Sequence, residues 1–213
     1  MKKIIGLMAL LFWAMAAWAE TPREIVSRME TTCEAHEGEG MIMIVDLKVP
    51  ILGTVTTKCY YLGDKSRMDA KMMGAEVITW DDGETMWSYN SKKNEIEIKD
   101  QTAEANAQSG GDLELFSNIA EGYDIVLKKE TNEAWYFQCK KSKANKEKDA
   151  PKSMDLTIDK NTYYPLSLST KMSGMTLTMR NLSFGVTEQQ VTFNPKDYPD
   201  AAVVDKRQPK TEE

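Results

Sequence analysis

Few residues of this 213-residue chain are suited to catalysis or metal binding. There is one histidine, His36, and the three cysteines, Cys33, Cys59 and Cys139, fit neither a C-x-x-C redox motif nor a zinc knuckle. A G-x-S-x-G nucleophile motif is absent. The sequence therefore gives no support for an enzyme, a metal site or a cofactor, and we expect His36 to be exposed in a loop.

Basic residues are also fewer than acidic ones. The chain has 27 lysines and arginines against 33 aspartates and glutamates, which gives a formal net charge of −6 at pH 7. A nucleic-acid backbone is polyanionic and selects basic proteins. This balance of charge argues against a nucleic-acid partner.

Long apolar runs are missing except at the N-terminus. Lys2 and Lys3 precede an apolar run over residues 4–18, which ends in Ala17-Trp18-Ala19. The run is shorter than the ~20 residues of a membrane-spanning helix, and the order of charge, apolar core and A-x-A exit is typical of a signal peptide. We expect cleavage after Ala19 and export from the cytoplasm. The alternative is a retained N-terminal anchor.

The remaining residues, 20–213, have the length of one domain. All three cysteines lie in this part, and none stands at the cleavage point to carry an acyl anchor. In an oxidising compartment at most one disulfide can form, and the sequence does not choose its partners. We expect small, apolar cysteine side chains with at most this one bridge.

A helix opens this domain. Thr21 as N-cap, Pro22 at the first helical position and Glu24 at the third predict a capping box. The apolar residues that follow recur at steps of three and four, which indicates one buried stripe. They are Ile25, Val26, Met29 and Cys33.

From Met41 onward the apolar period changes to two, which is typical of strands with one buried face. The predicted strands span residues 41–49, 55–61, 67–73, 76–80, 85–89, 95–99, 123–129, 134–140, 154–158, 164–170 and 175–182. Short links such as Gly63-Asp64 and Asp81-Asp82-Gly83 favour antiparallel hairpins over a cation site. The fold class is therefore mainly β with few helices (α+β), built on a large, curved antiparallel sheet.

Three segments depart from the strand pattern. Residues 100–111 form a small, polar arm, and a short amphipathic helix is predicted after it, with Asp112 as N-cap. The lysine-rich residues 141–152 are expected to be a solvated loop. The tip Val49-Pro50-Ile51-Leu52-Gly53 is apolar where a hairpin is normally polar, which suggests a contact surface for a membrane or partner protein, or burial under the helix.

Four segments, taken in their order along the chain, resemble one known family. They are Gly63-Asp64-Lys65-Ser66-Arg67-Met68, the segment Trp80-Asp81-Asp82-Gly83-Glu84-Thr85-Met86-Trp87-Ser88-Tyr89-Asn90, the segment Val191-Thr192-Phe193-Asn194-Pro195, and Val203-Val204-Asp205-Lys206-Arg207. Together with the N-terminal helix they resemble the LolA-like periplasmic lipoprotein carriers and, more broadly, the outer-membrane lipoprotein-sorting proteins. The resemblance covers most of residues 20–213.

The resemblance implies a fold and a function. The fold is an incomplete β-barrel covered by the N-terminal helix and a short lid helix. The function is to take up lipoprotein acyl chains, or another lipid, in an apolar cavity and to carry them through the periplasm without a cofactor. The implied partners are an inner-membrane release complex and an outer-membrane acceptor, and we expect a monomer.

The resemblance also suggests which residues form the cavity and its lid. Arg67 stands where the family carries an arginine within the barrel that helps to hold the lid closed. The full set is Met43, Val45, Arg67, Trp80, Met86, Leu113, Phe116, Ile119, Trp135, Phe137, Leu177 and Met179. The cysteines, the lysine-rich loop and the polar arm depart from the family pattern.

Methionine is abundant, with fourteen in the chain. Flexible thioethers can repack around varied ligands, which suits a lipid cavity, but they also fill irregular cores. A second reading of the same half-barrel therefore stays open: an envelope interaction or lipid-sensing module that does not transport lipoproteins.

Overall fold

The computed structural model describes residues 20–36, 38–51, 53–101, 116–148 and 150–207. One sheet contains twelve strands in the order β12-β6-β5-β4-β3-β2-β1-β11-β10-β9-β8-β7. Its strands are β1 (Met41–Val49), β2 (Gly53–Leu62), β3 (Lys65–Met72), β4 (Ala75–Asp81), β5 (Thr85–Asn90), β6 (Glu95–Asp100), β7 (Tyr123–Glu130), β8 (Ala134–Lys141), β9 (Ser153–Asp159), β10 (Pro165–Met172), β11 (Met175–Phe184) and β12 (Ala202–Asp205).

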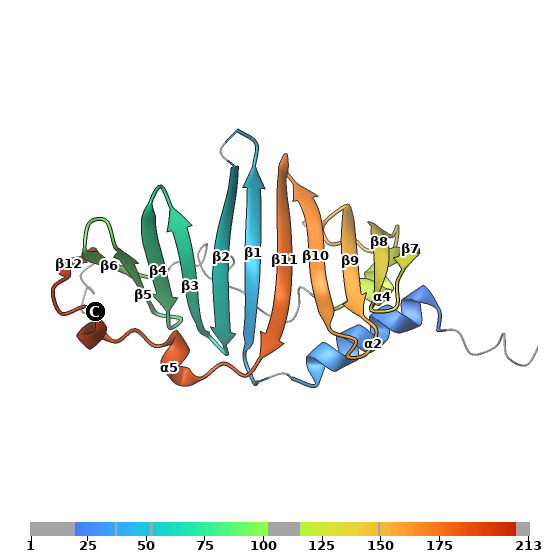
Figure 1. The fold of residues 1–213 in the computed structure, drawn as a ribbon, viewed down its shortest axis with the longest axis horizontal. Helices are drawn as coiled ribbons and strands as arrows, with labels where there is room; N and C mark the ends of the chain where they lie inside the picture. The colour runs from blue at the N-terminus through green and yellow to red at the C-terminus, as the bar shows by residue number, and fades with distance from the viewer. Residues whose placement is uncertain (1–19, 37, 52, 102–115, 149, 208–213) are drawn as a thin grey trace, which may run out of the picture.

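The sheet curves but does not close, because its edge strands β12 and β7 pair with one neighbour each (Figure 1). Neighbouring strands are antiparallel except β12, which runs parallel to β6. The predicted incomplete barrel is confirmed, and each of the eleven predicted strands has its counterpart. The twelfth strand, β12, was not predicted.

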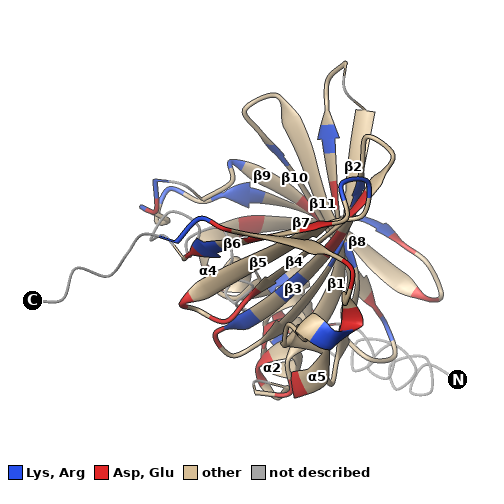
Figure 2. Ribbon diagram, turned by 90° about the vertical axis from the view of Figure 1, so that its left-hand side faces the viewer, with Lys and Arg blue, Asp and Glu red and all other residues tan. Residues whose placement is uncertain are grey.

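Three helices accompany the sheet in the described part of the chain. They are α2 (Pro22–Glu34), α4 (Ile119–Gly122) and α5 (Glu188–Val191), with a 3-10 helix, η2 (Pro195–Asp197), after them. Figure 2 shows α2 and α5 together at the end opposite the β1–β2 hairpin. Among the residues that the structure describes, no helix has the length and apolarity to span a membrane. The predicted signal peptide, residues 1–19, lies outside those residues.

Helix α2 forms as the sequence predicts. The Thr21 side chain accepts a hydrogen bond from the Glu24 amide at 3.3 Å, and the Glu24 carboxylate accepts one from the Thr21 amide at 2.7 Å. This capping box satisfies amides that the first helical turn leaves free. The predicted apolar stripe, with Met29 at its centre, is buried.

The cross-strand pairs divide the sheet into two faces. Met41, Met43 and Val45 of β1 lie on the face that packs against α2, which we name the helix-side face. Ile42 and Asp46 alternate with them and lie on the other face. We name this the tail-side face, because the segment after β11, residues 185–205, covers part of it; that segment is the C-terminal tail.

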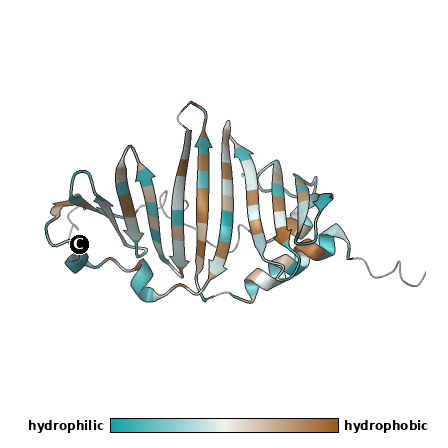
Figure 3. Ribbon diagram, viewed as in Figure 1, coloured by the Kyte–Doolittle hydropathy of each residue, from teal (hydrophilic) through white to brown (hydrophobic). Residues whose placement is uncertain are grey.

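The helix-side core lies between α2 and strands β1, β2 and β7 to β11. Its buried members include Met29 of α2, Met43 of β1, Phe137 of β8 and Leu168 of β10. Figure 3 shows the alternation of apolar and polar bands along these strands that puts one set of residues on this face. The same strands turn polar residues outward, as in the Asp46–Arg180 ion pair on the tail-side face.

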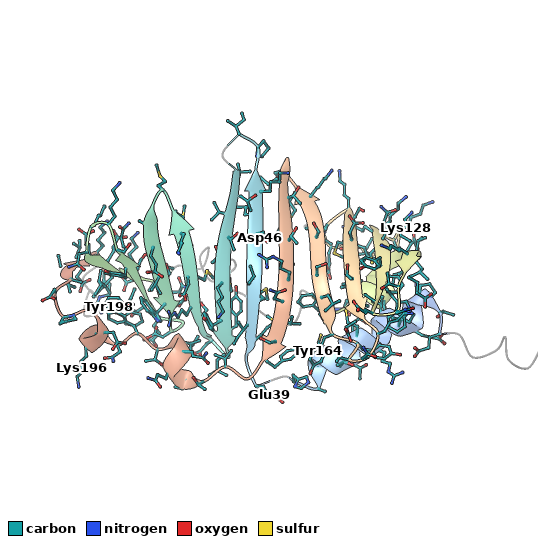
Figure 4. The ribbon with its side chains drawn as sticks, in the orientation of Figure 1. Glu39, Asp46, Lys128, Tyr164, Lys196 and Tyr198 are labelled. Atoms are coloured by element: carbon teal, nitrogen blue, oxygen red, sulfur yellow. The ribbon has the colours of Figure 1, made fainter. Side chains whose placement is uncertain are left out.

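The other half of the sheet is buried on its opposite face. Trp80 of β4 contacts Phe193 and Tyr198 of the C-terminal tail, with ring centroids 5.3 and 5.7 Å apart. Trp87 of β5 stacks on Phe193 at 5.5 Å, and Tyr89 lies 4.4 Å from Tyr198. A second, aromatic core therefore lies between β4, β5 and the tail, whose residue Tyr198 is labelled in Figure 4.

A glycine allows the tail to cross toward the tail-side face. The amides of Gly185 and Val186 donate to the carbonyls of Gly40 and Glu39, at 3.2 and 2.8 Å. Gly40 has φ +72°, and a Cβ there would lie 2.6 Å from the Tyr61 carbonyl oxygen and 2.7 Å from Val186 Cβ. Only glycine fits this backbone conformation and this close approach.

The three cysteines do not form the disulfide that the sequence allowed. Cys33, Cys59 and Cys139 are free thiols, and all three are buried in the helix-side core. Burial raises the pKa of Cys59 to about 11 and the pKa values of Cys33 and Cys139 to about 12. The thiols therefore stay protonated at neutral pH and serve as small apolar side chains.

Candidate functional site

A cavity of about 610 Å³ opens on the helix-side face at β9, β10 and β11. Its floor is apolar and methionine-rich: Met154 comes from β9, Leu168 and Met172 from β10, and Leu177 and Met179 from β11. This volume falls within the range of small-molecule and lipid sites, about 300 to 1,000 Å³. The cavity is therefore the candidate binding site.

The lysine-rich loop forms one wall of the cavity. Asn145, Glu147, Lys148, Ala150 and Pro151 line it, while Lys146 and Lys148 are exposed, so the loop is solvated as expected and also borders the cavity. Two hydrogen bonds anchor the loop, from the Lys141 amide to the Lys152 carbonyl and from the Ser142 amide to the Gly122 carbonyl, both at 3.0 Å. Polar groups thus stand at the rim, above an apolar floor.

Helix α4 contributes Ile119 to the wall beside this loop and is tied to α2. The Glu30 carboxylate of α2 accepts hydrogen bonds from the amides of Ile119 and Ala120, at 2.5 and 3.0 Å. Burial raises the pKa of Glu30 because the charged form loses hydration, although both amides lower it. The carboxylate therefore connects the N-terminal helix directly to the edge of the cavity.

The structure describes only part of the segment in which the lid helix was predicted. Leu113 and the N-cap candidate Asp112 lie outside the described residues. Phe116 and Ile119 are buried in the helix-side core, and Ile119 also lines the cavity. Of the helix expected here, the described part contains the single turn of α4, Ile119–Gly122.

Eight of the predicted site residues come together on the helix-side face. They are Met43, Val45, Phe116, Ile119, Trp135, Phe137, Leu177 and Met179. Three of them, Ile119, Leu177 and Met179, line the cavity. The others pack in the core beneath α2, so the structure places them around the site rather than in its wall.

Three further predicted residues lie elsewhere. Arg67 and Trp80 pair across β3 and β4 on the tail-side face, where the guanidinium lies over the Trp80 ring at 5.4 Å. Arg67 also forms an ion pair with Asp69 at 2.7 Å. Met86 is on the helix-side face but belongs to β5, away from the helix-side core.

His36 is not the exposed loop residue that the sequence suggested. Its side chain is 28% exposed and stacks on Phe184, with centroids 4.5 Å apart. Nε2 lies 2.6 Å from the hydroxyl of Tyr164, which Figure 4 labels near the end of α2. Nδ1 lies 3.1 Å from Glu39 Oε1. The histidine thus fastens the end of α2 to β10 and β11.

Sequence reasoning missed most of the cavity lining, including Tyr123, Met154, Leu168 and Lys148. Met154 lies within the predicted strand 154–158, and the abundance of methionine is the one sequence signal that points to it. Burial, with help from the charge of Glu147, raises the pKa of Tyr123, so this hydroxyl stays neutral. Within the described ranges, no cluster of three or more histidine, cysteine or acidic side chains could hold a metal ion.

Comparison with known proteins gives matches by structure alone. No protein-family model matches the chain, and no curated protein matches it in sequence. An uncharacterized conserved protein from Thermus thermophilus is 18% identical, with a TM-score of 0.47, and the match covers 84% of this chain and 98% of that one.

Two further solved structures match at lower identity. A LolA superfamily protein from Nitrosomonas europaea is 7% identical, with a TM-score of 0.33, over 84% of this chain and 100% of that one. In the MucA/MucB complex of Pseudomonas aeruginosa, the matched chain is 15% identical, with a TM-score of 0.44, over 82% of this chain and 62% of that one. The identities are too low to transfer a ligand or a partner to this chain.

Proposed function

We propose that this protein binds the acyl chains of lipoproteins in the cavity on its helix-side face and carries them between membranes. The observation that supports this most is the apolar floor formed by Met154, Leu168, Leu177 and Met179 beneath a polar rim. An acyl chain needs an apolar lining along its length, and the polar group to which the chain is attached needs an opening to solvent. Both are present in one cavity.

The energetics favour this class of ligand. Each methylene group removed from water contributes about 0.8 kcal/mol, so even a partly enclosed acyl chain gains several such increments. Methionine side chains can adapt to chains of different length and branching. A carrier needs this adaptability, because it must bind its cargo without committing to a single shape.

Release requires that the cavity can open. The α4 wall is one helical turn, held to α2 through Glu30 and to the loop through Gly122. A Cβ at Gly122 would lie 2.8 Å from Asn145 Nδ2, so this contact is close. A few such contacts can shift between open and closed arrangements at modest cost, as reversible loading demands.

The remaining parts of the proposal follow from the sequence. Cleavage after Ala19 would leave residues 20–213 as one periplasmic carrier domain without a covalent chemical step. Its cargo would come from an inner-membrane release complex and pass to an outer-membrane acceptor. We expect the carrier to act as a monomer and to need no cofactor.

Mass spectrometry of the protein recovered from an envelope fraction tests the proposal. We expect a co-purifying lipoprotein or acyl lipid with the wild type. Leu177→Asp places a charge in the cavity wall and should remove the cargo. Thr176→Asp is the matched control, because Thr176 is the neighbouring residue on the tail-side face.

Two outcomes would contradict the proposal. One is wild-type protein that is repeatedly empty and does not release lipoprotein from spheroplasts. The other is equal loss of cargo in Leu177→Asp and Thr176→Asp. A stable envelope partner, found by crosslinking and unaffected by Leu177→Asp, would instead favour the interaction or sensing module.

A further inference from the structure

Three hairpin turns at one end of the sheet expose large apolar side chains. The β1–β2, β3–β4 and β10–β11 turns lie at the same end because the six strands are consecutive neighbours in the sheet and antiparallel. Figure 1 shows these three turns along its upper edge. The exposed residues are Ile51, Met72, Met73 and Met172, which we name the tip surface.

The tip residues are unusual in their backbone as well as in their exposure. Met73 is 97% exposed and has φ +50°, next to Gly74 at φ +79°. A two-residue turn of this kind normally takes asparagine or aspartate before the glycine, because these tolerate the left-handed region and interact well with water. Ile51 combines full exposure with φ +72° and a β-branched side chain. Neither packing within the chain nor turn preference explains these residues.

The turns at the opposite end have ordinary chemistry. At the β4–β5 turn the Asp82 carboxylate accepts hydrogen bonds from the Glu84 and Thr85 amides, at 3.0 and 2.7 Å. At the β9–β10 turn, the Asp159 carboxylate accepts one from the Thr162 amide at 2.8 Å. These two turns are thus polar and self-bonded, in contrast to the three apolar tips at the other end.

Each apolar tip stands beside an exposed lysine. Lys48 precedes the β1–β2 turn, Lys71 directly precedes Met72, and Lys171 directly precedes Met172. Within the described residues no carboxylate lies within ion-pairing distance of these lysines, although Glu76 stands opposite Lys71 in the β3–β4 register. Figure 2 shows basic segments on the hairpins that point upward.

More lysines gather at the same end of the strands. Lys92 and Lys93 occupy the β5–β6 turn, and exposed lysines of the β8–β9 loop include Lys146 and Lys148. The net charge of the chain is −6, whereas these seven lysines outnumber the acidic residues of the same turns and loop that the structure describes, Glu76, Glu95 and Glu147. Apolar tips within a ring of lysines match a bilayer that carries anionic phospholipid: the tips enter the apolar layer and the lysines meet the phosphates.

We propose that the tip surface docks this protein on a lipid bilayer containing anionic phospholipid. Met172 belongs both to the tip surface and to the lining of the cavity. Docking would therefore bring the cavity wall to the bilayer surface, where an acyl chain could pass between them without crossing water. The docking stands on the tips and lysines alone and does not depend on which cargo fills the cavity.

Flotation with lipid vesicles tests this inference. The protein is recovered from an envelope fraction, and its N-terminus is checked by mass spectrometry so that an uncleaved apolar leader does not contribute. We expect binding to phosphatidylethanolamine–phosphatidylglycerol vesicles that weakens with salt, and weak binding to phosphatidylcholine vesicles. Ile51→Ser combined with Met73→Ser should reduce binding at least about tenfold, through lost insertion of two large apolar side chains.

Matched variants separate docking from general surface effects. Val203→Ser changes an exposed apolar residue of β12, away from the tips, and should leave binding unchanged. Lys48→Glu and Lys171→Glu should each reduce binding about fivefold or more, whereas Lys196→Glu in η2 should not. Mass spectrometry of the cargo of the Ile51→Ser and Met73→Ser variant should find it loaded as the wild type is, because neither residue lines the cavity, so that failure of docking and failure of cargo binding are distinguished.

Three results would overturn the inference. They are absence of vesicle binding by the wild type, equal binding to phosphatidylcholine and to phosphatidylglycerol vesicles, and unchanged binding after Ile51→Ser with Met73→Ser. Loss of a crosslinked protein partner in that variant, without vesicle binding by the wild type, would assign the tip surface to protein recognition instead.

Discussion

The two halves of the sheet are buried on opposite faces and with different side chains. Beneath α2, the helix-side core is rich in methionine, with Met29, Met41, Met43, Met154 and Met179 among its members. Under the C-terminal tail, the second core is aromatic and built on Trp80, Trp87, Tyr89, Phe193 and Tyr198. One continuous set of strands thus supports two packing layers, of which only the helix-side one is rich in methionine.

This difference places the cavity in the adaptable half. Aromatic rings have few rotatable bonds and fix their neighbours through preferred ring geometry, whereas methionine side chains repack readily. The cavity lies among Met154, Met172 and Met179, and within the described residues the aromatic core contributes none of its lining. We infer that the tail-side half holds the sheet in shape while the helix-side half accommodates the ligand.

The aromatic core should show the largest effect on stability. Trp80→Ala removes a side chain that is 4% exposed and contacts Phe193 and Tyr198, and should lower the free energy of unfolding by about 3 to 5 kcal/mol. Urea unfolding measures this, with Lys196→Ala as an exposed control in the same tail. A cost no larger than that of the control would mean that the tail is not part of a second core.

A truncation in the helix-side core should also lower the free energy of unfolding, by somewhat less. Met29 is fully buried, and Met29→Ala should cost about 2 to 5 kcal/mol of unfolding free energy, because a cavity remains where the thioether packed. Arg23→Ala on the exposed side of α2 is the control for effects on the helix itself. If both variants unfold at the same urea concentration, α2 does not cover a core.

The tie between α2 and α4 should have an intermediate effect. Glu30→Ala leaves the amides of Ile119 and Ala120 without their acceptor and should cost about 1 to 3 kcal/mol. Hydrogen exchange of these two amides should accelerate, and that acceleration separates a local tether from a general loss of stability. Unchanged exchange would show that Glu30 does not hold the cavity wall.

The raised pKa of Glu30 also predicts that the stability of the protein depends on pH. Its folded-state pKa is raised above 4.5, so its contribution to stability is fully present below the unfolded pKa and is lost as the pH rises through the folded pKa. Glu30→Gln keeps an acceptor oxygen without the charge and should remove that decline. Unfolding curves of both proteins across this range measure the difference; parallel curves would contradict the assignment.

The smallest effect is expected at the surface ion pair. Asp46 accepts hydrogen bonds from Arg180 Nε and the Thr56 hydroxyl, both at 2.6 Å, and these hold its pKa below 3.8. Its contribution is therefore present above the unfolded pKa and is lost as the pH falls through the folded one. Asp46→Asn should cost no more than about 1 kcal/mol at neutral pH, as exposed pairs do. Calorimetry against Asp155→Asn, an exposed residue on the same face, checks this.

Local signals in the sequence predicted much of the fold. The capping box of Thr21 and Glu24 and the period-two pattern between turns such as Gly63-Asp64 are local signals, so α2 and the eleven hairpin strands could be assigned. Strand β12 has four residues and pairs with β6 from a distant part of the chain. No local sequence pattern predicts a pairing between two segments so far apart in the chain.

The site was harder to predict because a period of two does not say which face is covered. The resemblance suggested that Arg67 and Trp80 belong to the cavity, but the residues that cover their face, Phe193 and Tyr198, lie far along the chain. Only their packing reveals that Trp80 belongs to the tail-side core. In the same way, the charges of Lys148 and its neighbours predicted a solvated loop, which the structure bears out, but they could not show that this loop also borders the cavity.

Methionine methyl NMR tests the central claim most directly. A protein with ¹³C-labelled methionine methyl groups is titrated with an acyl lipid, and the signals of Met154 and Met179, which line the cavity, are compared with that of Met86 on β5. We predict shifts at Met154 and Met179 and none at Met86. Shifts at Met86 alone, or no shift at Met154 and Met179 at saturating lipid, would contradict a binding cavity in the helix-side half.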